Sequence, residues 1–231
     1  MIDGFEFSVE VIRTDRKRSA SICLDGEGIK VRVPKELSDS YIRDLIERKS
    51  PWIKRKLRET EFVAPPRTRE FVSGETFSYL GKNYRLKVLN GDAPSVKLRG
   101  GYLEATVSGS LGTREEQVRS LLIKWYQRHA REKLQEKTRR YAKILQVKPR
   151  SVSVKNYKSR WGSCSAKGDI SYNWRIVIAP QRIVDYVVVH ELCHLFEHNH
   201  SPDYWRHVER IIPDFRECRQ WLKQNSKQLE V

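Results

Sequence analysis

The segment His190-Glu191-Leu192-Cys193-His194 has the pattern H-E-x-x-H and constrains the fold of this chain more than any other stretch. Residues four apart on a helix lie on one face, so both imidazoles can reach one metal ion if the segment is helical. In a strand, at about 3.3 Å per residue, the two histidines would lie more than ~13 Å apart. A shared metal therefore requires a helix, and Glu191 then supplies a carboxylate that can act on water at that metal.

The residues before this segment also favour a helix. Pro180 suits the first turn of a helix. Apolar residues then recur at helical spacing, at Ile183, Val184, Val187 and Val188. The run Val187–Val189 is β-branched and suits a strand equally well on periodicity alone, but only the helical interpretation gives both histidines a common ligand.

A catalytic zinc takes three protein ligands and keeps a fourth position for water. His198 would lie about 12 Å along a continued helix from His190, which is too far for a shared metal. His200 follows His194 by six residues, the spacing of H-E-x-x-H-x-x-G-x-x-H, and is the predicted third ligand. Glu197 stands where that pattern has glycine, so we expect Asn199 to make the turn in the left-handed conformation. The remaining downstream candidates are His207, Glu209 and Glu217.

Further motifs accompany the histidines. They are Lys158-Ser159-Arg160-Trp161-Gly162-Ser163-Cys164-Ser165, Gly168-Asp169-Ile170-Ser171-Tyr172-Asn173-Trp174-Arg175, Asn199-His200-Ser201, Tyr204-Trp205, Pro213-Asp214 and Trp221-Leu222. With weaker matches upstream, this series resembles the YgjP-like metal-dependent hydrolases, which are grouped with the WLM and SprT-type zinc peptidases. The resemblance covers nearly the whole chain. It implies His190, His194 and His200 as metal ligands and Glu191 as the catalytic acid/base.

The hydrophobic pattern predicts an α+β fold in two parts. Residues 1–110 read as a β-rich N-terminal module with a helical insert, and residues 111–231 as a zincin-like metallohydrolase domain with a small sheet. In the module we expect a strand at 5–11, a hairpin around Asp25-Gly26-Glu27-Gly28, and a helix from Asp39 that Pro51 breaks. A linker is expected at 61–69, four short strands between 77 and 107, and a long amphipathic helix from Thr113 to about Leu145.

The formal charge of +16 is uneven along the chain. Residues 111–160 hold 15 Lys/Arg against 4 Asp/Glu, whereas residues 161–231 hold 9 of each. The basic excess therefore belongs to the long helix and the segment after it, which is either a solvated face or a surface for polyanions such as nucleic acid. The four scattered cysteines form no C-x-x-C pair, no apolar run approaches about 20 residues, and no signal peptide is apparent. A cytoplasmic protein without a membrane span is expected.

Three functions fit these residues, and the first is preferred to the other two. The first is zinc-dependent peptide hydrolysis with Glu191 as general base. The second is hydrolysis of a nucleoside triphosphate at the same metal site, as in a UTP-type pyrophosphatase, with Mg²⁺ in addition and with Lys158 and Arg160 near the phosphates. The third is a nucleic-acid-associated protein with a structural zinc, which Glu191 argues against. The substrate-binding residues are not determined; Arg160, Ser163, Ser165 and Asn173 are candidates for lining a cleft.

Overall fold

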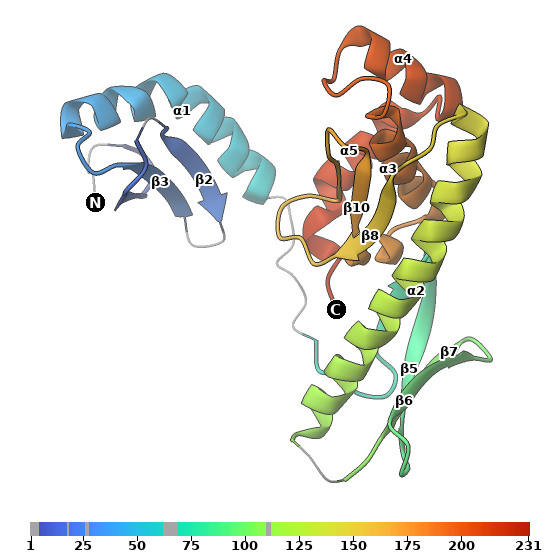
Figure 1. Cartoon of the computed structure of the whole chain (residues 1–231). Coiled ribbons are helices and arrows are strands. Elements are labelled where there is room, and N and C mark those ends of the chain that lie inside the picture. The colour runs from blue at the N-terminus through green and yellow to red at the C-terminus, as the bar shows by residue number, and fades with distance from the viewer. Residues whose placement is uncertain (1–4, 18, 26–27, 62–68, 110–111) are drawn as a thin grey trace. The chain divides into compact units, whose positions relative to one another are not determined.

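The computed structural model describes residues 5–17, 19–25, 28–61, 69–109 and 112–231. The fold is mixed α+β, as predicted, and contains three small sheets and five α-helices in the described residues. The chain forms two compact units, residues 1–65 and 66–231. Figure 1 shows the elements of each unit.

The first unit is a three-stranded sheet with one helix. Its strands are β1 (Val9–Thr14), β2 (Ser21–Asp25) and β3 (Gly28–Pro34), in the order β1-β3-β2, with β1 parallel and β2 antiparallel to β3. The helix is α1 (Asp39–Glu61). Alternate residues of β3 point into a core that α1 closes, because the buried set is Val9, Ile29, Val31, Val33, Ile42, Ile46 and Ile53.

Two expectations for this unit are corrected. The strand begins at Val9, and Phe5 and Phe7 stack on each other outside it. Pro51 does not end the helix, because α1 continues through it with Ile46 and Ile53 buried on either side. Packing thus outweighs the cost of a proline in a helix, about 3 kcal/mol. The tip of the predicted hairpin, at 26–27, and most of the predicted linker, at 62–68, lie outside the described residues.

The second unit begins with a four-stranded sheet and the long helix. The strands are β4 (Thr76–Tyr79), β5 (Lys82–Asn90), β6 (Ser95–Arg99) and β7 (Tyr102–Val107), in the order β4-β5-β7-β6. Helix α2 (Arg114–Leu145) packs against β7 and, further along, against the second sheet (Figure 1). Because the two sheets share one hydrophobic core, residues 76–107 belong to this unit and not to an N-terminal module ending at 110.

The second sheet and the remaining helices carry the motifs that accompany the histidines in the sequence. Strands β8 (Ser151–Lys155), β9 (Gly162–Cys164) and β10 (Asp169–Asn173) have the order β8-β10-β9, so β9 is an edge strand. A 3₁₀ turn η1 (Trp174–Ile178) leads to α3 (Gln181–Cys193), which contacts β9. Helices α4 (Pro202–Ile211) and α5 (Phe215–Asn225) and a short turn η2 (Ser226–Gln228) follow, and α4 and α5 both pack on α3.

Candidate metal site

Three imidazoles meet where α3 ends. His190 lies in the last turn of α3, His194 is its C-cap residue, and His200 lies in the loop that leads to α4. The ring nitrogens that they offer all lie within 4.8 Å of one another, and the Nε2 atoms of His190 and His200 are 3.3 Å apart. In the described part of the chain, this is the one group of His, Cys, Asp and Glu side chains close enough to hold a metal ion.

The loop after α3 brings His200 back by a different turn from the one expected. Among the described residues, non-glycine positive φ angles occur at Phe71, Leu80 and Gln146, so Asn199 does not adopt the left-handed conformation. Its side chain instead accepts a hydrogen bond from the Ser201 backbone N–H at 3.2 Å. This local bond shapes the turn as an Asx motif.

Hydrogen bonds and ring contacts fix the orientation of the histidines. His194 Nδ1 is 3.0 Å from the carbonyl oxygen of Glu197. A carbonyl can only accept, so Nδ1 carries the proton and Nε2 is left as the ligand atom. Tyr204 donates its hydroxyl to the carbonyl oxygen of His190 at 2.9 Å, and its ring stacks on that of His194 at 4.6 Å. The ring of Trp205 stacks on His200 at 5.5 Å.

The histidines are held in the form that binds metal. The pKa of His190 is lowered to about 3, first by burial and then by the neighbouring His194, His200 and Arg219. Burial also lowers the pKa values of His194 and His200. All three imidazoles are therefore neutral near pH 7, as a metal ligand must be.

Glu191 lies in a buried position beside the edge strand. Only 5% of the residue is exposed. A Cβ atom placed on Gly162, the first residue of β9, would lie 2.5 Å from Glu191 Oε1. The carboxylate of Glu191 therefore packs directly against the backbone of Gly162, where any larger residue would place a side chain. Burial raises the pKa of Glu191 to about 8, and the positive charge of Arg160 acts in the opposite direction. A carboxyl group with such a pKa can both take and return a proton near neutral pH.

The geometry and donor set fit zinc. Tetrahedral Zn²⁺ holds imidazole nitrogens at about 2.0–2.1 Å, which places two ligand nitrogens roughly 3.4 Å apart. The 3.3 Å separation of the Nε2 atoms of His190 and His200 matches this value, and the other ligand atoms, which lie within 4.8 Å of one another, would have to move closer together to bind one ion. Three nitrogen donors without a carboxylate suit zinc and do not suit Mg²⁺, which prefers oxygen.

The other candidates for a third ligand are engaged elsewhere. His207 stacks on Phe196, Glu209 accepts a hydrogen bond from Arg216, and Glu217 pairs with Arg182. His198 is exposed and outside the cluster. The cysteines are all free thiols, with Cys193 and Cys218 buried.

The candidates for lining a cleft divide into two groups. Asn173 is buried and holds the preceding loop, and Ser165 bonds to Asp169 at 3.3 Å. Ser163 lies on β9, 3.0 Å from the hydroxyl of Tyr157, and Arg160 is exposed. Sequence reasoning did not find the roles of Gly162 and Tyr204. The motif around Trp161-Gly162 draws attention to Gly162, but only the folded structure shows that Gly162 lies against Glu191.

His190, His194 and His200 form a group that could hold a metal ion, and the helix that bears His190 also bears the buried carboxylate of Glu191. The model of the YgjP-like family, described as a metallopeptidase domain, matches residues 18–225. The chain therefore belongs to the YgjP-like family, and the resemblance seen in the sequence is confirmed. Nothing in these comparisons supports nucleotide hydrolysis, and no curated protein matches the chain.

Two solved structures are similar to part of the chain. The metallopeptidase zymogen abylysin of Pyrococcus abyssi is 22% identical, with a TM-score of 0.38, over 42% of this chain and 99% of its own. The metallopeptidase zymogen jannalysin of Methanocaldococcus jannaschii is 17% identical, with a TM-score of 0.37, over 40% of this chain and 96% of its own. Within the described residues, no helix is both long and apolar enough to cross a lipid bilayer.

Proposed function

We propose that this protein is a zinc-dependent metallopeptidase in which His190, His194 and His200 bind the metal and Glu191 is the general base. The observation that carries the proposal is the convergence of three imidazole nitrogens within 4.8 Å at the end of the helix that also bears Glu191. Membership in a family described as metallopeptidases supports the same activity.

Zinc bound by these imidazoles would lower the pKa of a water molecule to about 7 and polarise the peptide carbonyl. Glu191 would take a proton from the attacking water at a carboxylate oxygen. It would then deliver that proton to the amine nitrogen of the leaving group as the C–N bond breaks. In the metal-free protein, burial raises the pKa of Glu191 to about 8, so its carboxylate is more basic than that of a free glutamate and better able to accept the proton.

The edge strand supports a peptide as the substrate. Strand β9 pairs with β10 on one side only, and its first residue, Gly162, contacts Glu191. An extended peptide can add to such an edge through main-chain hydrogen bonds, which bind it without regard to most side chains. A peptide on β9 would then pass the carboxylate of Glu191.

The test is hydrolysis of casein by the zinc-loaded protein and by Glu191→Gln. We expect turnover to fall at least a hundredfold in the variant while the bound zinc, measured by mass spectrometry, stays at the wild-type ratio. The matched control is Glu197→Gln, because Glu197 contributes only its backbone carbonyl to the site. Casein cleavage that persists in Glu191→Gln, or survives removal of the metal by a chelator, would refute the proposal.

A further inference from the structure

A pocket of about 460 Å³ lies between the loop that precedes β9 and the C-terminal segment after α5. We call it the basic pocket. Its charged lining residues are Lys158, Arg160, Arg175, Lys227 and Glu230. Four cations therefore face one carboxylate, and its size is within the range of ligand-binding pockets, about 300–1,000 Å³.

Most cations of the basic pocket have no carboxylate within ion-pair distance in the described residues. In the part of the chain that the structure describes, Lys158, Arg160 and Lys227 form no ion pair with a carboxylate. Arg175 donates to Asn156 Oδ1, which is a neutral amide. The pocket thus keeps a surplus of positive charge that an anionic group can satisfy.

Buried contacts order the loop that carries these charges. Asn173, 3% exposed, donates its side-chain amide to the carbonyl oxygens of Tyr157 at 3.0 Å and Arg160 at 3.2 Å. Its backbone N–H bonds to the carbonyl oxygen of Trp161 at 2.8 Å. The guanidinium of Arg160 lies 5.6 Å from the ring centroid of Tyr157. A pocket held in this way needs little reorganisation to bind a ligand.

The basic pocket and the candidate active site meet at neighbouring residues of the chain. Trp161 lines the pocket, and the next residue, Gly162, contacts Glu191. An extended peptide advances about 3.3 Å per residue. A peptide whose scissile bond lies at Glu191 therefore reaches the basic pocket within a few residues.

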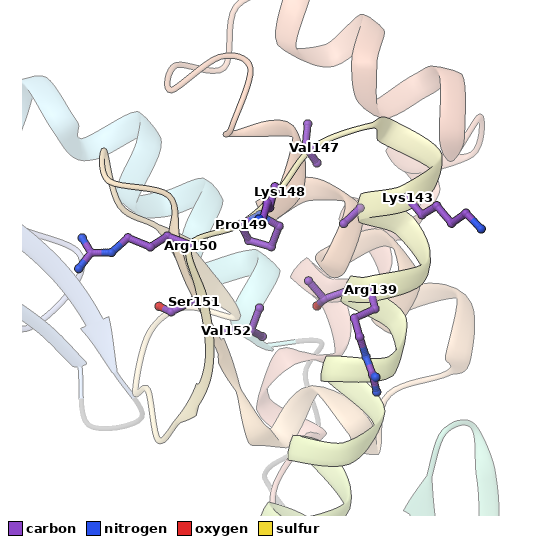
Figure 2. Close-up of a pocket in the computed structure, with 10 residues that line it drawn as sticks. Arg139, Lys143, Val147, Lys148, Pro149, Arg150, Ser151 and Val152 are labelled. Carbon is purple, nitrogen blue, oxygen red and sulfur yellow. The ribbon is translucent and has the colours of Figure 1, made fainter.

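A second pocket with basic residues lacks this convergence. It has a volume of about 430 Å³ and lies between α2 and the segment that leads to β8. Figure 2 shows that the charged ends of Lys143 and Arg150 extend in opposite directions, away from the pocket. Val147, Pro149 and Val152 supply apolar walls. Because its cations do not face a common point, we expect this second pocket not to bind an anionic group. Its residue Lys143 therefore supplies the control variant for the experiment below.

We propose that the basic pocket binds an acidic side chain of the peptide substrate and makes the enzyme prefer peptides with glutamate or aspartate near the cleaved bond. This proposal rests on the proposed peptidase function, because only a peptidase has a peptide substrate. The preference of the pocket for acidic peptides can still be measured by binding alone. Carboxylate is the shared chemistry of the two side chains, and the pocket's lysines and arginines are its usual partners.

The experiment measures fluorescence anisotropy of labelled short peptides on the zinc-loaded Glu191→Gln protein, in which peptides stay intact. Each peptide contains one glutamate, scanned through the sequence, and is paired with a peptide that has glutamine at that position. We expect one or two glutamate positions to bind roughly fivefold tighter than glutamine, as for a partly exposed ion pair, with the gain falling as salt rises. Adding Arg160→Gln or Lys227→Gln should remove this preference, and adding the control Lys143→Gln should keep it.

The proposal is overturned if glutamate and glutamine peptides bind equally at every position, or if Lys143→Gln removes the preference as strongly as Arg160→Gln. Displacement of the peptides by inorganic phosphate without any preference for glutamate also overturns it, since the pocket would then be a phosphate site. Charge-dependent peptide binding by a wild-type protein that cleaves nothing would refute the peptidase proposal and leave the pocket assignment intact.

Discussion

The carboxylate of Glu191 and the backbone of Gly162 are in direct contact across the interface of α3 and β9. A Cβ atom at Gly162 would lie 2.5 Å from Glu191 Oε1, 2.6 Å from its Cγ and 2.7 Å from its Cδ. No side chain other than hydrogen leaves room for Glu191 in this rotamer, because real Cβ atoms do not approach other heavy atoms this closely. The glycine therefore sets where the proposed general base can lie.

Replacement of Gly162 by alanine should displace the carboxylate of Glu191. We expect kcat on a peptide substrate to fall by about ten- to a hundredfold, because the displaced carboxylate would no longer be aligned with the attacking water. The overpacking should also lower the free energy of unfolding by about 1–3 kcal/mol. The zinc content should not change, since the three histidines lie outside the contact.

Gly109→Ala is the matched control for this prediction. A Cβ atom at Gly109 has no neighbour within 4 Å, and the residue is exposed. Its kcat and unfolding free energy should equal those of the wild type within error. Wild-type turnover in Gly162→Ala would show that Glu191 can act from another position.

The buried position of Glu191 predicts how the stability of the metal-free protein depends on pH. The pKa of Glu191 is about 8 in the folded protein against 4.5 for the free group, because burial disfavours the charged carboxylate. Protonated Glu191 therefore makes its whole contribution to the free energy of unfolding below pH 4.5. This contribution is lost as the pH rises toward 8. A glutamine at this position cannot ionise, so its contribution to stability does not change with pH.

Glu191→Gln should therefore gain stability relative to the wild type between about pH 4.5 and 8, by on the order of a few kcal/mol, and the difference should level off above pH 8. Urea denaturation of both chelator-treated proteins across this range measures the difference. If the stability difference between Glu191→Gln and the wild type shrinks as the pH rises, burial does not raise the pKa of Glu191 and the prediction is wrong.

The sequence predicted that His190, His194 and His200 lie close together, because their spacing is local. Helical periodicity places His190 and His194 on one face, and the six-residue interval from His194 restricts where His200 can lie. The contact between Gly162 and Glu191 could not be predicted in this way. It depends on how an edge strand packs against a helix from a later part of the chain, which no periodicity encodes.

The organisation of the chain shows the same limit. Alternation located the strands between 77 and 107, but alternation does not say which core a strand joins. Phe77 and Leu103 are buried in one cluster with Val118 and Leu122 of α2, and so the sheet belongs to the larger unit. Pro51 is a second example, because local rules predict a break where buried neighbours maintain the helix.

The long helix α2 begins with a capping box whose loss is measurable. The hydroxyl of Thr113 accepts the Glu116 backbone N–H at 3.2 Å, and Glu116 Oε2 accepts the Thr113 backbone N–H at 3.0 Å. Thr113→Ala should lower the free energy of unfolding of the protein by about 1 kcal/mol, since one N–H loses its partner. Thr113→Ser keeps the hydroxyl and should match the wild type in the same denaturant titration. Equal losses in both variants would mean that the methyl group, not the cap, carries the effect.

A buried ion pair joins α2 to α3, the helix that bears His190. Lys137 Nζ lies 2.6 Å from Asp185 Oδ1, and the two side chains are 8% and 14% exposed. Asp185→Asn leaves the ammonium of Lys137 without a countercharge in a buried position, and should cost about 3–5 kcal/mol of unfolding free energy. Because α3 carries His190, zinc affinity should weaken as well.

The double variant Lys137→Met with Asp185→Asn should recover most of this loss, since it leaves no buried charge unpaired. The exposed pair of Lys133 and Glu136, with side chains 41% and 62% exposed, provides the control. Glu136→Ala should cost less than about 1 kcal/mol. Urea denaturation of these three variants and of the wild type measures the differences. If Asp185→Asn costs no more than Glu136→Ala, the pair is not what couples α2 to α3, and apolar packing between the two helices accounts for their contact.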